Sequence, residues 1–130
     1  MTLFTKIITG QIGCEKIYED DLTFAFLDIK PHTLGHTLIV PKIEVGDFVD
    51  LPQKYVNRIF ENAQKIGKAI EKATGCKRVG LMVQGFGVPD HFHLHICGIN
   101  SPRDLDQNNS RQETRENLLK IQAKILEHLN

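Results

Sequence analysis

Three histidines alternate with apolar residues in the segment HFHLHIC, residues 91–97. In an extended strand, successive side chains point to opposite faces. The three imidazoles would therefore line one face, while Phe92, Leu94 and Ile96 enter a core from the other. Neighbouring imidazoles would lie roughly 6.5–7 Å apart along the strand, whereas a helix would scatter them around its axis. The spacing predicts a histidine cluster on one face of a strand.

Two kinds of chemistry compete for such a cluster. A single strand histidine is most often a hydrogen-bonded structural residue, but burying three polar rings together costs free energy in desolvation, which favours a functional role. Imidazoles can hold zinc or another metal, with water or a carboxylate completing the coordination. A neutral imidazole, with an ordinary pKa of about 6.5, can instead attack a phosphoryl or acyl group. The residues alone leave both uses open.

Length and charge limit what the chain can be. Its 130 residues predict one domain, residues 1–130, large enough for a real core. Sixteen basic and sixteen acidic side chains give zero formal net charge. No overall field therefore attracts a nucleic-acid polymer or an acidic membrane surface, and neither is an expected partner.

Cysteine usage and the amino terminus point to the cytoplasm. The three cysteines are widely spaced, odd in number and form no Cys-x-x-Cys, which is typical of a reducing compartment. Lys6 interrupts the apolar residues of the first ten, so we expect neither a signal peptide nor a membrane span there.

Short apolar runs separated by turn residues predict a sheet of about five strands. Asp20-Asp21 supplies a turn between the first two runs, which should pair as a hairpin, and Pro31 and Gly35 turn the chain before the third. The predicted strands are residues 16–19, 23–28, 36–41, 79–84 and the histidine segment.

Helical spacing is strongest over residues 52–74, where apolar side chains recur at i, i+3, i+4 and i+7 and Gly75 can cap the end. A short helix is expected over residues 3–9. A second main helix is expected at about 111–129, opened by a capping box of Ser110 and Glu113. The predicted fold class is α+β, with an antiparallel sheet and two main helices in a single domain.

The segment 91–97 resembles the His-φ-His-φ-His-φ-φ motif of the histidine triad (HIT) family of nucleotide hydrolases and transferases. The opening LFTKIITGQIGCEKIYEDD is similar to the family's lead-in helix and following strand. FAFLDIKPHTLGHTLIVPK resembles its Asp-Ile-x-Pro segment, Gly-His pair and Val-Pro-Lys strand end. These matches follow the family's order over roughly residues 3–97. The resemblance implies a HIT-like fold and a homodimer.

The resemblance also implies roles for four histidines. His93 matches the nucleophile that attacks an α-phosphorus and becomes nucleotidylated. His95 matches the residue that hydrogen-bonds the phosphate and assists at the bridging oxygen or nitrogen. His91 and His36 match the histidines that frame and orient the nucleophile.

The same resemblance implies a nucleotide-binding set. Asp28 matches the carboxylate that accepts the ribose hydroxyls, and Gln84 and Gly87 fall in the loop that contacts phosphate. The positions that match the apolar surroundings of the base are Phe4, Ile7, Phe26 and Ile29. On the residues alone, such apolar side chains are more often plain core, and an aspartate before a turn is more often a turn carboxylate.

The chain departs from the family at two places. Thr2 and Thr5 replace a Cys-x-x-Cys that helps bind structural zinc in many members, and Ile43-Glu44 stands where a histidine commonly follows. In the loop before the histidines, Val88 replaces a hydroxyl residue. We therefore expect no metal site and no cofactor, with phosphate binding resting more on backbone N–H groups near Gly87.

The predicted activity is hydrolysis or transfer at the α-phosphate of a ribonucleotide conjugate through a covalent nucleotidyl-histidine. Candidate small-molecule substrates are a nucleoside phosphoramidate, an adenylylated amine or a dinucleoside polyphosphate. Two alternatives stay open: a metal-dependent hydrolase that uses the same histidines, and a non-catalytic nucleotide-binding sensor.

Overall fold

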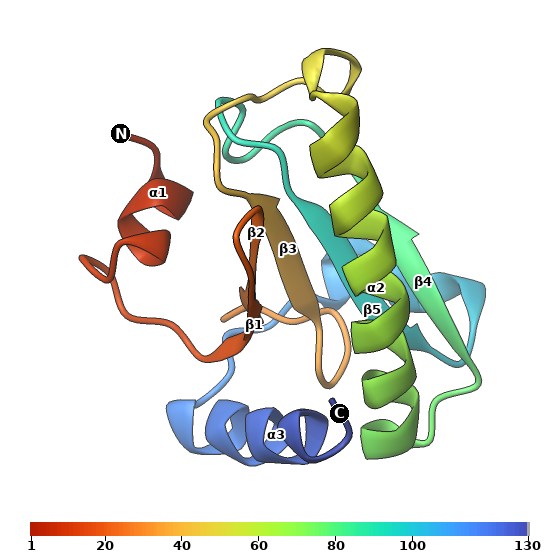
Figure 1. Cartoon of the computed structure of the whole chain (residues 1–130). Coiled ribbons are helices and arrows are strands. Elements are labelled where there is room, and N and C mark those ends of the chain that lie inside the picture. The colour runs from red at the N-terminus through yellow and green to blue at the C-terminus, as the bar shows by residue number, and fades with distance from the viewer. Residues whose placement is uncertain (130) are drawn as a thin grey trace.

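Five short strands form a single antiparallel sheet in the computed structural model, which describes residues 1–129 (Figure 1). The order across the sheet is β1-β2-β3-β5-β4, and every pair of neighbours is antiparallel. The strands are β1 (Lys16–Glu19), β2 (Thr23–Leu27), β3 (Thr37–Pro41), β4 (Arg78–Met82) and β5 (Leu94–Ile99). The predicted α+β fold with a five-stranded antiparallel sheet is confirmed, as is the β1–β2 hairpin, in which Asp20 Oδ1 accepts the Leu22 and Thr23 backbone N–H groups.

Three α-helices accompany the sheet among residues 1–129: α1 (Leu3–Ile8), α2 (Gln53–Thr74) and α3 (Arg115–Glu127). Short 3-10 turns lie at η1 (Phe48–Asp50), η2 (Pro102–Leu105) and η3 (Gln107–Asn109). Gly75 ends α2 with φ of 72°, the left-handed cap that the sequence predicted. No helix in this part of the chain combines the length and the apolar character needed to cross a bilayer.

The start of α3 differs from the prediction. The helix begins at Arg115 rather than near residue 111, and Thr114 is its N-cap, accepting the Asn117 backbone N–H. Ser110 does not cap it, because the Ser110 hydroxyl donates to the Lys30 carbonyl 2.8 Å away, at the far end of another loop. The hydrogen bond to Lys30 thus uses the Ser110 side chain that the local sequence pattern predicted as the helix cap.

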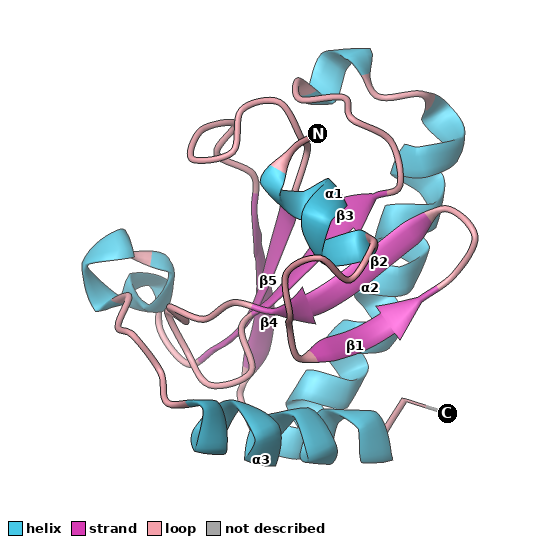
Figure 2. Ribbon diagram, turned by 90° about the vertical axis from the view of Figure 1, so that its left-hand side faces the viewer, coloured by secondary structure: helices cyan, strands magenta, loops and turns pink. Residues whose placement is uncertain are grey.

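The two faces of the sheet carry different side chains and different helices. One face packs on α2 and α3 and includes Ile39, Leu94 and Ile96, together with Phe92 just before β5. The opposite face carries a smaller aromatic cluster with Phe4 of α1. Figure 2 shows α1 on the near side of the sheet and α2 behind it. The alternation expected from the histidine motif is therefore observed, since its apolar residues enter the main core.

Only the second half of the histidine motif is a strand. β5 begins at Leu94, so His91 and His93 precede it. The ladder with β3 reaches only as far as Ile39 opposite Leu94. Beyond that pair, the carbonyl of Pro41 accepts a hydrogen bond from the His91 ring instead of from a strand backbone. The His91 side chain thus bonds the Pro41 carbonyl, which a longer β3–β5 ladder would have used.

Candidate active site

The histidines of the motif gather on the sheet face that α1 covers. Rings of His93 and His95 lie 5.1 Å apart between centroids, closer than the spacing expected along an ideal strand. His36, just before β3, lies 5.1 Å from His95 across the β3–β5 pair. All four predicted catalytic histidines are buried. What each can do chemically depends on which ring nitrogens the protein already uses.

Both ring nitrogens of His91 are occupied by the protein. Nε2 lies 2.7 Å from the Pro41 carbonyl, which can only accept, so Nε2 carries the proton. Nδ1 is then an acceptor and takes the Thr2 hydroxyl proton at 2.7 Å. Burial lowers the pKa of His91, partly offset by the bond to Pro41. His91 is a neutral ring with no nitrogen left for a substrate.

His93 has one nitrogen fixed and the other free to react. Its Nδ1 lies 3.0 Å from the carbonyl of His91 and must donate, so the lone pair is on Nε2. The ring of Phe4 packs edge-on against it, with centroids 5.0 Å apart. A neutral imidazole held in this tautomer is a nucleophile without needing a separate base.

His36 and His95 are linked so that their protons point one way. The backbone N–H of His32 donates to His36 Nδ1 at 3.0 Å, which leaves the His36 proton on Nε2. That proton is donated to His95 Nδ1, 2.9 Å away, so His95 carries its own on Nε2. His95 Nε2 is buried and has no partner within the described chain. His95 Nε2–H is therefore a donor without an acceptor, and the neighbouring ring is that of His93, which has a free nitrogen.

Burial keeps both of these rings neutral near pH 7. Desolvation lowers the pKa of His36 to about 3, with a further contribution from His32. Desolvation also lowers the pKa of His95 to about 4, aided by His36 and His93 and opposed by Asp28. The site therefore presents neutral imidazoles, the form needed for attack at phosphorus and for donation from His95 Nε2.

Asp28 lies at the end of β2, facing His36. Its Oδ1 accepts the Lys30 backbone N–H at 2.8 Å, so the carboxylate does serve the turn. Its Oδ2 lies 3.7 Å from His36 Nε2, and the side chain is partly exposed. One carboxylate oxygen is thus committed to the loop, while the other faces the histidines.

The apolar residues expected around the base divide into buried and exposed members. Phe4 and Phe26 are buried with ring centroids 5.7 Å apart, and Ile7 packs against the same cluster. Ile29 is 55% exposed beside Asp28. Phe4, Phe26 and Ile7 therefore belong to the core, as the sequence analysis considered more usual for such apolar residues.

The loop between β4 and the histidines places Gln84 and Gly87 at the surface side of the site. The Gln84 amide is half-buried and contacts the Met82 sulfur at 3.5 Å. Gly87 is exposed with φ of 88°, a conformation that favours glycine. Val88 packs against the Phe4 cluster, and its carbonyl accepts the His91 backbone N–H at 3.3 Å.

Thr2, Thr5 and Glu44 converge on His91, at the position where the sequence departs from the zinc-binding pattern and no metal site was expected. The Thr2 backbone N–H donates to the Glu44 carboxylate at 2.5 Å and the Thr5 hydroxyl donates to it at 2.7 Å. These hydrogen bonds, that of the Thr2 N–H first, lower the pKa of Glu44 to about 2. Hydroxyls do not supply the thiolates that structural zinc prefers, and His91 Nδ1 is already bonded to Thr2. This donor set does not fit zinc.

A second group of residues could offer ligands to a metal. One ligand atom from each of Asp28, His36 and His95 lies within 4.8 Å of the other two. The hydrogen-bond pattern argues against a metal there. His36 Nε2 carries the proton that it donates to His95, because its Nδ1 accepts the His32 N–H. A protonated nitrogen has no lone pair for a metal. The residues therefore fit a hydrogen-bonded chain better than a coordination shell.

Two features of the site were not anticipated from the sequence. The sequence assigned no role to His32, but its ring packs on His36. Residues 110–113, which the sequence predicted to open the last helix, instead lie along the loop that follows Asp28. Their bonds run from the Ser110 hydroxyl to Lys30 O, from Arg111 N to Pro31 O and from Glu113 N to Ile29 O. The only sequence signal for the contact between His32 and His36 was their spacing of four residues. That spacing brings the two rings together only because the turn folds His32 back onto His36.

Comparisons with known proteins agree with this arrangement. Residues 9–101 match the HIT domain. The chain is 35% identical over 96 residues to an adenosine 5'-monophosphoramidase from Schizosaccharomyces pombe, covering 72% of this chain and 71% of that protein. It is 36% identical to an adenylylsulfatase from Arabidopsis thaliana, covering 72% of this chain but half of that protein.

Among solved structures, a HIT-like protein from Bartonella henselae, involved in cell-cycle regulation and crystallised with an unknown ligand, is similar with a TM-score of 0.87 and 30% identity. The match covers 98% of this chain and 96% of that one. Sequence, motif and fold agree over most of the length of the chain. The chain belongs to the HIT family.

Proposed function

We propose that this HIT-family protein hydrolyses or transfers nucleotidyl groups, acting at the α-phosphate of a ribonucleotide conjugate through a covalent intermediate on His93. One observation carries the proposal. Of the three motif histidines, His91 has no free nitrogen, His93 has a free lone pair on Nε2 and His95 has a free proton on Nε2. A nucleophile and a hydrogen-bond donor thus stand side by side.

In the first step, His93 Nε2 attacks the α-phosphorus. The new phosphorus–nitrogen bond forms as the bond to the leaving group breaks, and His95 Nε2–H hydrogen-bonds the departing oxygen or nitrogen. In the second step, water or another acceptor displaces the imidazole. Because His93 keeps its proton on Nδ1, the nucleotidylated ring is a cationic imidazolium, which departs from phosphorus as a neutral imidazole. Asp28 Oδ2 would accept ribose hydroxyls, and Ile29 would edge the base.

The class of substrate is supported by the relatives. Two of them carry the names adenosine 5'-monophosphoramidase and adenylylsulfatase. We transfer from these names a nucleoside monophosphate joined to a leaving group. Nucleoside phosphoramidates, adenylylated amines and dinucleoside polyphosphates all have this form, and we propose the phosphoramidates as the first to test.

The decisive experiment is to trap and map the intermediate. Substrate labelled at the α-phosphate is mixed with the protein, quenched, digested and analysed by mass spectrometry. We expect the label on His93, and a His128→Ala variant, which changes an exposed histidine just after α3, to label normally. Label on another residue, or no label despite turnover, would overturn the assignment.

The same substrate separates the two alternative functions. Turnover of a fluorogenic nucleoside phosphoramidate that persists after exhaustive chelation argues against a metal-dependent hydrolase. Binding of AMP without any turnover would instead favour the sensor.

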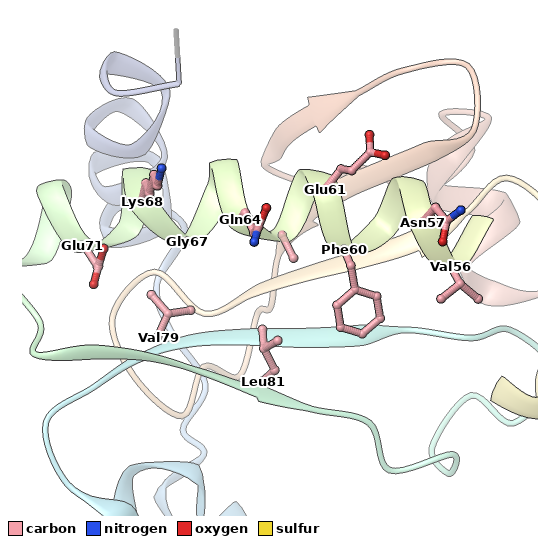
Figure 3. A pocket seen from close by; sticks show the side chains of 11 residues that line it. Val56, Asn57, Phe60, Glu61, Gln64, Gly67, Lys68, Glu71, Val79 and Leu81 are labelled. Atoms are coloured by element: carbon pink, nitrogen blue, oxygen red, sulfur yellow. The ribbon is translucent and has the colours of Figure 1, made fainter. Parts of the chain in front are cut away.

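We also propose that the protein forms a homodimer through a groove between α2 and β4. The groove has a volume of about 820 Å³ and is open to solvent (Figure 3). Phe60 and Leu81 point into it and are 39% and 44% exposed. β4 is an edge of the sheet, so its outer backbone groups can pair with the same strand of a second copy.

Sedimentation of the protein tests the dimer directly. A Leu81→Glu variant should shift the protein to monomer, whereas Leu119→Glu, which changes an equally exposed leucine on α3, should not. An unchanged mass for Leu81→Glu, or a monomeric parent protein, would contradict the proposal.

The three cysteines are free thiols, which supports the proposal of a cytoplasmic location.

A further inference from the structure

His32 lies in the turn between β2 and β3 with two donors directed at one acceptor. Its backbone N–H is 3.0 Å from His36 Nδ1. Its ring nitrogen Nδ1 is 3.2 Å from the same atom, and the two rings pack with centroids 4.9 Å apart and planes inclined by 58°.

The positions of the protons follow from this geometry. His36 Nδ1 accepts the backbone N–H of His32, so it holds no proton of its own. Two unprotonated nitrogens at 3.2 Å would repel, so His32 carries its proton on Nδ1 and donates it as well. His32 Nε2 is then an acceptor, and it is buried without a partner.

Three imidazoles therefore form a directed chain. His32 Nδ1–H donates to His36 Nδ1, and His36 Nε2–H donates to His95 Nδ1. The chain ends at His95 Nε2–H, which has no partner among residues 1–129. The His32 backbone N–H already keeps His36 Nδ1 unprotonated, and the ring of His32 adds a second donor to the same atom. Because adjacent hydrogen bonds polarise one another, this second donor strengthens the donation from His36 to His95.

We propose that His32 is a positioning residue for the reaction: it holds His36 in the tautomer that makes His95 a donor at Nε2. This inference rests on the proposed function, since the donor matters only if a leaving group or phosphate oxygen accepts from it. His32 does not touch the substrate in this account. It acts through His36.

The C-terminal segment explains why His32 stays in place. Arg111 N–H donates to Pro31 O, at 3.4 Å, immediately before His32. The Ser110 hydroxyl and Glu113 N–H bond the two preceding carbonyls, of Lys30 and Ile29. Residues 110–113 thus hydrogen-bond three consecutive carbonyls of the loop, which limits the movement of His32 away from His36.

Removal of the His32 ring should change protonation as well as geometry. The ring covers His36 and contributes to the low pKa of both His36 and His95. Asp28 Oδ2, 3.7 Å from His36 Nε2, is the carboxylate that faces the pair, and His93 is the remaining neighbouring imidazole of His95. Without His32, water reaches His36 Nδ1, and the pKa of His36 should rise.

The test is the pH dependence of kcat and KM for a nucleoside phosphoramidate. His32→Ala should lower kcat by about twofold to tenfold, the effect of losing one neutral hydrogen bond, with KM unchanged. The acid limb of kcat should move to higher pH. His32→Asn should restore most of the rate and the profile, because its Nδ2–H can stand where Nδ1–H stood. An unchanged profile, or His32→Asn as impaired as His32→Ala, would overturn the proposal.

A second measurement keeps the inference separate from the proposed function. Nitrogen-15 NMR of the imidazoles should show His36 and His95 protonated at Nε2 in the parent protein and in His32→Asn. In His32→Ala, which keeps the backbone N–H but loses the ring donor, the His36 Nδ1 and His95 Nε2 resonances should shift away from their parent positions. If this pattern holds but no substrate is turned over, the positioning is correct and the proposed function fails. If turnover occurs but the nitrogen-15 resonances of His36 and His95 do not respond to His32→Ala, His32 is structural only.

Discussion

The two ends of the histidine motif use the same side chain in opposite ways. At one end, His91 gives both ring nitrogens to the protein, through Pro41 and Thr2. At the other end, His95 gives one nitrogen to His36 and leaves the second buried and unpaired. Both rings are buried and both have a lowered pKa. Burial and titration therefore do not distinguish them, and the difference lies in which hydrogen bonds remain to be made.

The two ends are also supported by different parts of the chain. His91 is fastened to α1 and to Glu44 through the threonines at the amino terminus. His95 is fastened to the β2–β3 turn, which the segment 110–113 holds from outside. His93 lies between them, with its Nδ1 fixed by the His91 carbonyl. In the proposed mechanism, the His91 end orients the nucleophile, and the His95 end supplies the donor.

The largest expected effect is at the centre of the motif. His93→Ala removes the only motif nitrogen with a free lone pair, so turnover should fall on the order of 10⁴-fold or more, as for the nucleophiles of other covalent enzymes. AMP binding, measured by calorimetry, should be retained because Asp28 and Ile29 are untouched. His128→Ala is the matched control. Residual turnover near the parent value would remove His93 as the nucleophile.

His95→Ala should have the next largest effect. The loss of a positioned donor should slow turnover by roughly 10²- to 10³-fold, within the range of general acid–base effects. The nucleophile remains, so the label on His93 should still form. Rates with a series of leaving groups sharpen the comparison, because poor leaving groups should suffer most. Equal slowing for every leaving group would show that His95 does not act at the departing atom.

The ribose contact gives a smaller effect. A 2′-deoxy substrate leaves Asp28 without one hydrogen-bonded hydroxyl, which costs about 1–3 kcal/mol, or about one to two decades in kcat/KM. The measurement compares matched ribo and deoxyribo phosphoramidates, and Asp28→Asn should reduce the preference. Because Oδ1 also accepts the Lys30 N–H, the thermal stability of Asp28→Asn must be recorded alongside. Equal efficiency for both sugars would remove Asp28 from this role.

Local pattern predicted the elements better than the contacts between them. The strand at residues 16–19 and the capped helix before Gly75 follow from apolar spacing and turn residues, and both are observed. The alternation at Phe92, Leu94 and Ile96 correctly placed the core side of the motif. These features depend on residues close in sequence, where the periods of strand and helix operate.

Long-range hydrogen bonds account for what the sequence did not predict. β5 begins late because the His91 ring takes the carbonyl of Pro41, fifty residues away. α3 begins late because Ser110 bonds Lys30, eighty residues away. The part played by His32 depends on the turn that folds it back onto His36. No pattern within one segment encodes such partners.

The smallest effect concerns the structural end of the motif. Thr2→Val removes the hydroxyl that bonds His91 Nδ1 and caps α1 through the Thr5 N–H. We expect a loss of about 1 kcal/mol in the free energy of unfolding, the usual value for an N-cap, measured by urea denaturation. Thr9→Val, at the exposed end of the same helix, should cost less than about 0.5 kcal/mol.

Chelation provides the matching test of this cluster. The Thr2, Thr5, Glu44 and His91 groups satisfy one another, so dialysis against EDTA should leave the free energy of unfolding of the parent protein unchanged. Added zinc should not raise it. A loss on chelation that zinc restores would mean that hydroxyl and carboxylate donors hold a metal here. The structural end would then be a coordination site, and the contrast with His95 would rest on a metal rather than on hydrogen bonds.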